Sequence, residues 1–452
     1  MQLKIHTISP IHIGTGYCFE PFEFIIQNNK FYKLDKDKAF RIIYKKRPEA
    51  INEISKWLND NSHLIIRSKD NEEQSKIRRK FNLQYFCEDF LNDKNLTSEI
   101  INNATSYSCQ IPYDLQGKYQ IAEHIKDPES NVYIPGSSIK GAIRTALLNM
   151  AVISLSAEKI TEITQNITQS NSYISKKGKL IDDLLIDEIF NCGKTKTNRI
   201  TNTVFTDYSD VKYDLFKFIT VSDAHPIKCK LQILPPNLYI ANQEPQTQLN
   251  ALECIRFNST FLFNINVNED ELRTIQHSVN NEKWIDFDLK FERLFGVKIT
   301  DVAVGKLEEV IVKSILEKIE AFTNLIIEKE LAWVKSVEDF KPSQAENIAE
   351  FYKVYKSEIP NMLRIGWGSG FISTTAFLSF IKNSIGQEFI VNLLNHFRIG
   401  IPQNMKDDNS AEIKSIEHFP KSKRLISKSV KTPLDPLGWI AILDIDEEIE
   451  LE

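Results

Sequence analysis

The clearest structural signal in this chain is the segment Tyr133-Ile134-Pro135-Gly136-Ser137-Ser138-Ile139-Lys140-Gly141-Ala142-Ile143-Arg144. Tyr133 and Ile134 have strand character, and apolar residues then recur at helical spacing up to about Leu155. Ser137 or Ser138 is expected to cap this helix, because a serine side chain can accept a hydrogen bond from a free amide in the first turn. The segment therefore predicts a strand, a glycine turn and a helix in direct succession.

The same segment has the features of an anion-binding site. Gly136 and Gly141 allow the backbone to approach a ligand closely, and a helix N-terminus presents amides with partial positive charge. Lys140 and Arg144 are four residues apart and so share one face of the helix. The glycines have the spacing of a P-loop, but Ala142-Ile143 replaces the Lys-Ser/Thr pair, which excludes a nucleoside triphosphatase. A capped helix with small residues for close packing is the alternative interpretation.

A second glycine-rich stretch lies near the other end of the chain, Arg364-Ile365-Gly366-Trp367-Gly368-Ser369-Gly370-Phe371. Glycines beside an arginine suit contact with phosphates. Trp367 and Phe371 offer faces on which a base could stack, which contributes about 1–3 kcal/mol per base. Taken alone, a glycine turn around a core tryptophan is an equally common interpretation.

A third candidate is His12, in the turn-rich segment Ile11–Gly16 that follows the first predicted strand. A histidine here could act as a general base toward a ribose 2′-hydroxyl. The sequence around His12 shows no second group that would protonate the leaving oxygen. A phosphate-contacting or structural role for His12 is therefore favoured. Because no Ser/His/Asp arrangement or paired carboxylate stands out either, the sequence predicts no catalytic residue.

Charge is distributed unevenly along the chain. The net charge of −5 argues against a nucleic-acid partner. However, Lys421 to Lys431 carries five basic residues and no acid, and further basic clusters lie at Arg41–Arg47, Lys76–Lys80 and Lys194–Arg199. A local basic groove on an acidic body is compatible with RNA binding, although each cluster alone is more simply a solvated face.

Composition indicates a globular protein of 452 residues, with 42% hydrophobic and 26% charged residues. The longest apolar stretch, Ala146–Leu155, falls short of the roughly 20 residues that span a membrane. With no signal peptide visible at the N-terminus, we expect a cytoplasmic protein without membrane contact. The six cysteines contain no CxxC pair, so no metal site and no cofactor is expected.

Two β/α halves, each carrying a glycine-rich loop, predict an α+β protein. We place an N-terminal domain at residues 1–200, with the glycine-rich loop at 135–144 and an exposed polar insertion at 156–200. A C-terminal domain at residues 201–452 carries a helical insertion at 268–356 and the glycine-rich loop at 364–371.

Together these segments resemble the RAMP superfamily (repeat-associated mysterious proteins) of CRISPR systems. The opening Ser9-Pro10-Ile11-His12-Ile13-Gly14-Thr15-Gly16 looks like the first strand and loop of that family. Residues 134–144 are similar to its most recurrent motif, and residues 364–371 look like its C-terminal glycine-rich loop. The chain length, this last loop and Thr432-Pro433-Leu434-Asp435-Pro436-Leu437-Gly438-Trp439 favour the group that holds the 3′ end of the guide RNA in type III-A (Csm) effector complexes.

That resemblance implies two ferredoxin-like (RRM-related) domains and a non-catalytic subunit that binds the 3′ part of the guide crRNA. It also implies a place at one end of a stack of backbone subunits, and a role in crRNA maturation through recruited host nucleases. The implied partners are crRNA, target RNA, and the backbone and small subunits of the Csm complex. The alternatives are a metal-independent, guide-processing endoribonuclease that uses His12, and another RAMP subunit of a type III complex.

The predicted RNA-binding residues lie in three loops: His12, Gly14 and Gly16; then Gly136, Ser137, Ser138, Lys140, Gly141 and Arg144; and finally Arg364, Gly366, Trp367, Gly368, Ser369 and Gly370. Guides differ in sequence, so these residues are expected to recognise phosphates and RNA shape rather than base edges. This interpretation requires loops from both halves of the chain to lie along one track.

Overall fold

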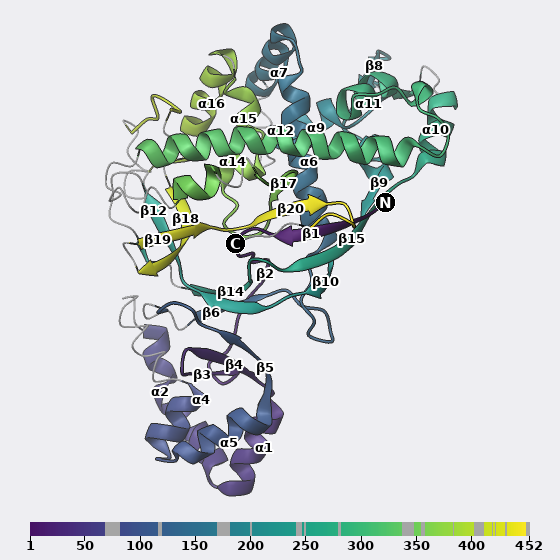
Figure 1. Cartoon of the computed structure of the whole chain (residues 1–452). Helices are drawn as coiled ribbons and strands as arrows, with labels where there is room; N and C mark the ends of the chain where they lie inside the picture. The colour runs from purple at the N-terminus through teal and green to yellow at the C-terminus, as the bar shows by residue number, and fades with distance from the viewer. Residues whose placement is uncertain are drawn as a thin grey trace.

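The computed structural model describes residues 1–67, 82–115, 120–169, 181–198, 201–240, 246–247, 250–278, 282–336, 348–353, 358–382, 384–401, 411–417, 419–420, 422–429 and 432–448. Helices and strands mix along the chain, and helices flank the sheets (Figure 1). The predicted α+β class is confirmed.

The central sheet joins the two ends of the chain. β1 (Gln2–Thr7) pairs antiparallel with β15 (Thr260–Val267) on one side and with β20 (Trp439–Leu443) on the other, so Ile5 lies between Phe261 and Ile442. Three more strands extend this sheet: β9 (Ile219–Val221) and β10 (His225–Lys228) beside β15, and β17 (Met362–Arg364) beside β20.

Two helices cover this sheet and complete the main core. α6 (Gly136–Ile153) contacts α12 (Leu307–Ser336), and α12 runs across the upper body in Figure 1. Apolar residues four apart, such as Ile139 and Ile143 in α6 or Ile311 and Ile315 in α12, are fully buried. They share one core with Leu3 of β1, because each helix turns an apolar stripe toward the sheet.

A second, seven-stranded sheet lies below the first and carries a helical lobe (Figure 1). Its strands, in spatial order, are β2 (Gly14–Cys18), β6 (Gln120–His124), β14 (Asn250–Ile255), β11 (Leu231–Leu234), β5 (Thr105–Gln110), β4 (Lys30–Leu34) and β3 (Phe24–Gln27). The lobe consists of α1 (Lys36–Lys46), α2 (Ala50–Arg67), α4 (Leu83–Tyr85), the π-helical turn η1 (Phe86–Phe90) and α5 (Lys94–Ala104). The lobe has its own core around Ile43, Phe86 and Ile100.

The remaining elements form two small sheets and peripheral helices. The small sheets consist of β12 (Pro236–Ile240), β13 (Gln246–Thr247), β18 (Ser422–Ser429) and β19 (Thr432–Pro436), and of β7 (Gly193–Thr197), β8 (Val204–Asp207) and β16 (Lys283–Ile285). The helices are α7 (Ala157–Gln169), α9 (Ile181–Ile189), η2 (Val211–Tyr213), η3 (Leu215–Phe218), α10 (Glu269–Ser278), α11 (Phe287–Phe295), η4 (Ile299–Asp301), α14 (Phe371–Thr374), α15 (Phe377–Phe380) and α16 (Ser384–His396).

Both large sheets cross the predicted boundary between residues 200 and 201. β1 pairs with β15 and β20, and β6 pairs with β14. The division into residues 1–200 and 201–452 therefore does not coincide with a division between sheets. Local periodicity shows where strands are, whereas which strands pair is decided by contacts that are distant in sequence.

The structure corrects the prediction of an exposed insertion at residues 156–200. In its described part, α7 and α9 bury Ile160, Ile163, Leu185 and Ile189 in the main core. A few apolar residues at helical spacing are enough to anchor these helices among their polar neighbours. The described part of segment 268–356 is mainly helical, as predicted, with the short strand β16 inside it, and α12 is part of the main core rather than an addition to it.

Across the described segments, no single helix is both long and apolar enough to cross a membrane. α6 and residues Ala157–Gln165 pass the test of length and apolarity only as a pair bent by 115°. The buried residues of α6 belong to the main core of this protein.

Candidate nucleic-acid interface

Three loops that are far apart in sequence are bonded together at one end of the central sheet, where β1 and β17 end and β20 begins. The Trp367 amide donates to the His12 carbonyl at 2.8 Å, the Gly438 amide donates to the Pro10 carbonyl at 2.9 Å, and the Ile365 amide donates to the Gly438 carbonyl at 2.8 Å. The first loop of the chain, the second glycine-rich stretch and the loop before β20 therefore form one unit.

Gly366 makes this junction possible. Its φ of +75° lies in the left-handed region, and a Cβ atom there would be 2.6 Å from the His12 carbonyl oxygen. Only glycine adopts this conformation without strain and also leaves room for the close approach. A glycine is therefore required at Gly366 because this loop packs closely against the His12 carbonyl near the N-terminus.

A cavity of about 620 Å³ opens beside this junction. This volume falls in the usual range of ligand sites, about 300–1,000 Å³. Its lining residues are His12, Gly14, Gly16, Tyr17, Cys18, Gln120, Ala122, Asn250, Leu252, Trp367 and Arg424. The structure therefore brings together His12, Gly14, Gly16 and Trp367 of the predicted RNA-binding residues, and among the described residues the lining includes one guanidinium and no carboxylate.

Arg424 is the cation of this cavity. Its guanidinium lies 5.2 Å from the centroid of the Trp367 ring. Arg424 is exposed, whereas the preceding residue, Lys423, is buried, because successive side chains of β18 point to opposite faces. The sequence had indicated Arg424 only as one member of the basic cluster at 421–431. The alternation of side chains along β18 explains why Arg424, rather than Lys423, reaches the cavity.

His12 is held at the back of this site by Glu253. The His12 Nδ1 atom lies 2.7 Å from the Glu253 carbonyl oxygen. Burial, aided by the nearby Lys126 ammonium, lowers the pKa of His12 although the bond to this carbonyl opposes the shift. His12 is 2% exposed, and the ring of His124 lies 6.0 Å away between centroids.

The Glu253 side chain forms a buried polar cluster behind His12. Its carboxylate is 0% exposed and accepts hydrogen bonds from the Tyr107 hydroxyl at 2.6 Å, the His124 amide at 3.0 Å and the Lys126 ammonium at 2.6 Å. Burial and the Glu253 charge raise the pKa of Tyr107. Glu253 was missed because a single acidic residue in the apolar strand β14 gives no distinct sequence pattern.

A basic cleft of about 190 Å³ lies on the other side of the same junction. Its lining includes Lys228, Lys230 and Arg256, and the Arg256 guanidinium is 5.0 Å from the centroid of the Phe257 ring. Ile11 and Ile255 form an antiparallel bridge. His12 follows Ile11 and lines the cavity, whereas Arg256 follows Ile255 and lines the cleft. Arg256 is distant in sequence from the two lysines, so the sequence did not indicate that they form a cluster.

The N-terminus of α6 is not an open anion site. The Gly136 amide donates to the Asp223 carboxylate at 2.7 Å, and a Cβ on Gly136 would lie 2.3 Å from the Val221 carbonyl oxygen. The predicted serine cap is wrong, because Pro135 is the N-cap and Asp223 satisfies the first amide. Ser137 is exposed and Ser138 half-buried in the first turn.

Lys140 and Arg144 already have protein partners. Lys140 donates to the Ile219 carbonyl at 2.6 Å, and Arg144 pairs with Asp214 at 2.8 Å. The structure does not bring Lys140 or Arg144 to the cavity. Gly141 is exposed, and a Cβ there would meet nothing within 4 Å. For Ser137, Ser138 and Gly141, contact with phosphate stays a prediction.

Arg364 and Ser369 are buried rather than presented to RNA. Arg364 donates to the Leu437 carbonyl at 2.9 Å and the Gly368 carbonyl at 3.1 Å, and it pairs with Glu330 at 3.1 Å. Ser369 is 2% exposed and donates to the Gly366 carbonyl. The predicted phosphate contact of Arg364 is corrected: its guanidinium holds the glycine-rich loop in shape.

Gly368 and Gly370 shape this loop, with φ of +85° and +80°. A Cβ on Gly368 would lie 3.0 Å from Leu437. Phe371 packs on Phe377 and Phe419, with ring centroids 5.5 and 5.3 Å away, so it belongs to an aromatic cluster. Neither Gly368 nor Gly370 lines the cavity.

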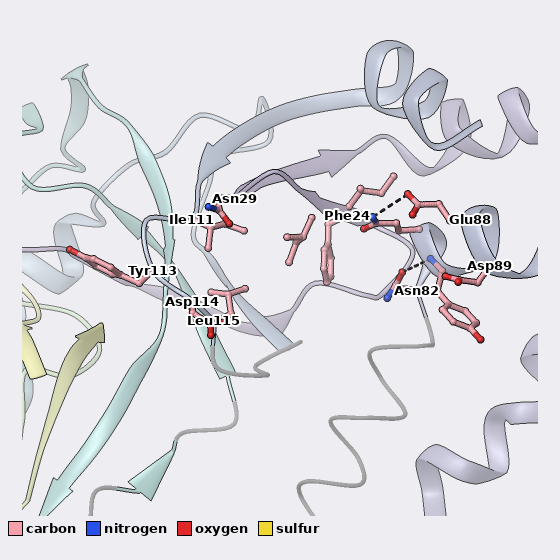
Figure 2. A pocket seen from close by; sticks show the side chains of 13 residues that line it. Phe24, Asn29, Asn82, Glu88, Asp89, Ile111, Tyr113, Asp114 and Leu115 are labelled. Carbon is pink, nitrogen blue, oxygen red and sulfur yellow. Dashed lines mark hydrogen bonds between the residues drawn. The ribbon is translucent and has the colours of Figure 1, made fainter. Parts of the chain in front are cut away.

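A second cavity of the same volume, about 620 Å³, lies between the helical lobe, β3 and the loop after β5, and it is acidic. Figure 2 shows Phe24 at its centre, between Glu88 and Asp89 on one side and Asp114 on the other. Its described lining residues include no cation, and Gln84 donates to Glu88 at 3.1 Å. Carboxylates repel phosphates, so we leave this cavity out of the nucleic-acid interface.

Most of the other predicted basic clusters are paired inside the protein or lie outside the described residues. Lys194 pairs with Asp210 at 2.5 Å, and Lys196 pairs with Asp207. Lys46 pairs with Glu99. The cluster Lys76–Lys80 lies outside the described residues.

Comparison with known proteins identifies the class. The sequence profile of the RAMP superfamily matches residues 4–373. The chain therefore belongs to the RAMP superfamily.

Among individual proteins, the chain is similar to two described as "CRISPR system Cms protein Csm5". The one from Streptococcus thermophilus is 27% identical over 186 residues, which cover 40% of this chain and 48% of that protein. The one from Methanocaldococcus jannaschii is 22% identical over 454 residues, which cover 97% of this chain and 88% of that protein.

Two solved structures have the same fold. One is a chain of the Csm–crRNA–target RNA ternary complex of a type III-A CRISPR-Cas system, with a TM-score of 0.60, 22% identity, and coverage of 98% of this chain and 100% of that one. The other is the crystal structure of T. onnurineus Csm5, with a TM-score of 0.57, 21% identity, and coverage of 97% and 99%.

Proposed function

We propose that this protein is a non-catalytic, cytoplasmic subunit of a type III-A CRISPR complex that binds the 3′ part of the guide crRNA. One observation carries the proposal. Loops from the two ends of the chain meet where Trp367 donates to His12, and they border a cavity whose described lining carries a cation and no carboxylate. Membership of the RAMP superfamily and the likeness to Csm5 proteins support it.

The RNA backbone follows the cavity and the basic cleft. Arg424 in the cavity, and Lys228, Lys230 and Arg256 in the cleft, contact phosphates. Glycine backbone at Gly14 and Gly16 permits a close approach of the sugar–phosphate chain. Such contacts are independent of sequence, which suits a subunit that serves guides of many sequences.

In the complex, the protein stands at one end of the stack of backbone subunits, beside the small subunits. It supports crRNA maturation and complex assembly, recruits host nucleases, and lies close to bound target RNA. Native mass spectrometry of the affinity-purified complex tests this placement. An end subunit is present once per guide RNA, and several copies per guide would indicate a backbone subunit.

RNA binding is tested with Lys228→Gln, Lys230→Gln and Arg256→Gln combined. We expect the combined variant to lose at least tenfold in affinity for several unrelated single-stranded RNAs alike, because each lost phosphate contact weakens binding. The matched control changes three exposed lysines elsewhere, Lys38, Lys306 and Lys414, to Gln. Equal affinities of the two variants would refute the proposed interface.

The alternative function, a metal-independent endoribonuclease, uses the imidazole of His12 as a base. It needs a second group for the leaving oxygen, and two donors of the polar cluster behind His12, Lys126 and Tyr107, are both bonded to Glu253. Incubation of the protein with CRISPR repeat RNA in EDTA decides between the two. We expect no specific product, whereas cleavage lost in His12→Ala would favour the enzyme.

A further inference from the structure

The cavity presents a hydrogen-bond acceptor at His12. A carbonyl oxygen can only accept, so the 2.7 Å contact with Glu253 fixes the proton of the neutral ring on Nδ1. The His12 Nε2 atom then has a lone pair and no proton. Its lowered pKa, caused first by burial, is consistent with a neutral ring.

Gly14 keeps this nitrogen open. A Cβ atom on Gly14 would lie 2.9 Å from His12 Nε2, so any side chain there would crowd the acceptor. Gly14 and His12 both line the cavity. Within the described residues, no group donates a hydrogen bond to His12 Nε2.

A second acceptor in the same lining has no partner. The Asn250 Oδ1 atom is buried and unbonded in the described part of the chain, whereas its Nδ2 donates to the Cys18 sulfur at 3.5 Å. Buried polar atoms are rarely left without a partner. Asn250 Oδ1 has no surface open to the cavity, whereas His12 Nε2 is, among the described residues, an unbonded acceptor beside it, and this acceptor points to a ligand that brings a hydrogen-bond donor.

A phosphate oxygen cannot supply such a donor, and an acceptor lone pair repels it. The ribose 2′-hydroxyl can donate, and it is the group that distinguishes RNA from DNA. On the proposed function, this sugar enters a site where Arg424 can hold the adjoining phosphate. Tyr17, which is 76% exposed, offers a ring for the base.

We propose that the cavity is a ribose-reading site, in which His12 Nε2 accepts a hydrogen bond from one 2′-hydroxyl of the bound strand. His12 is then a specificity-determining residue for RNA over DNA. It touches the sugar without taking its proton. The inference rests on the proposed function, because it presumes that a nucleic-acid strand occupies the cavity.

The test compares single-stranded RNA with DNA of the same sequence at one salt concentration. His12→Asn keeps an amide that can donate to the Glu253 carbonyl but lacks an atom at the position of Nε2. Gly14→Ala retains the His12 imidazole but places a Cβ about 2.9 Å from Nε2, which crowds this acceptor. We expect the wild-type protein to prefer RNA by about tenfold, the effect of one good hydrogen bond. In both variants this ratio should approach one through weaker RNA binding, with DNA binding unchanged.

Two controls make the result specific. His277→Asn, an identical change at an exposed histidine of α10, should retain the preference for RNA. RNAs with a single 2′-deoxy nucleotide at successive positions should show one position to which the wild type is sensitive and the two cavity variants are not.

The outcomes separate the two proposals. If the wild type binds no RNA, the proposed function fails. If it binds RNA but His12→Asn and Gly14→Ala leave the RNA-to-DNA ratio unchanged, the ribose-reading site is refuted while the function stands. Equal losses for RNA and DNA in both variants would likewise refute it, since they would show that His12 only shapes the loop.

Discussion

Arg364 donates to the Leu437 and Gly368 carbonyls and pairs with Glu330, which also pairs with Lys423 at 2.6 Å. One buried carboxylate thus pairs with two buried cations. The two cations hold the pKa of Glu330 below its usual value although burial opposes this. At the scale of single residues, the glycine-rich loop therefore owes its shape to a charge cluster that reaches it from α12 and β18.

We predict that Glu330→Gln lowers the free energy of unfolding by about 3–5 kcal/mol, because Arg364 and Lys423 would remain buried without a counter-charge. Urea unfolding followed by tryptophan fluorescence measures the change. Glu309→Gln removes an exposed partner of Lys306 on the same helix and should cost less than about 1 kcal/mol. Similar losses for both variants would show that the cluster does not stabilise the fold.

His124 predicts a pH dependence of stability. Burial, with added repulsion from His12 and Lys126, lowers the pKa of His124 from 6.5 to about 3. The unfolded chain binds this proton more readily, so the contribution is unchanged above pH 6.5 and stability falls as pH drops from 6.5 toward 3. Between pH 7 and pH 5 the loss is about 2 kcal/mol.

His124→Asn tests this dependence, because asparagine can still accept from the Ile13 amide, which bonds to His124 Nδ1 at 3.1 Å, and it does not titrate. Unfolding free energies at pH 7 and pH 5 should differ less in this variant than in the wild type. An identical slope in both proteins would assign the acid sensitivity to other groups.

At the scale of elements, sequence patterns located most helices but not their partners. The helix after Pro135 was predicted from its periodicity, and α6 confirms it. Its cap, Asp223, is 87 residues away in sequence and no local pattern points to it. For the same reason Lys140 and Arg144 were interpreted as free cations, whereas Ile219 in β9 and Asp214, the N-cap of η3, are their partners.

We predict that Lys140→Ala with Arg144→Ala destabilises the protein by about 2–4 kcal/mol. The pair loses the bond to Ile219, the ion pair with Asp214 and the contact of Arg144 with the Phe190 ring at 4.3 Å. The salt dependence of RNA binding should stay as in the wild type, measured under conditions where the variant is folded. A slope lower by about 1.4 would instead show that both cations contact phosphate.

At the scale of the whole molecule, local composition did not predict the sites that form where distant segments meet. The sequence indicated the α+β class, the three loops and the basic stretch that contains Arg424. It did not indicate the basic cleft, because Lys228, Lys230 and Arg256 come from two separate segments joined by strand pairing. Nor did the net charge of −5 show that one cavity is acidic and the other is lined by a cation.

This separation of charge predicts the salt dependence of RNA binding. Each phosphate contact releases bound counterions, so the logarithm of affinity falls with the logarithm of salt by about 0.7 per contact for a single strand. Changing Arg424, Lys228, Lys230 and Arg256 together to Gln should lower that slope by about 3. The control, with the same net change at the exposed residues Lys38, Lys306, Lys382 and Lys414, should keep the wild-type slope. If the two fourfold variants lower the slope equally, RNA binding depends on the total charge of the protein. The RNA would then not run along the cavity and the cleft.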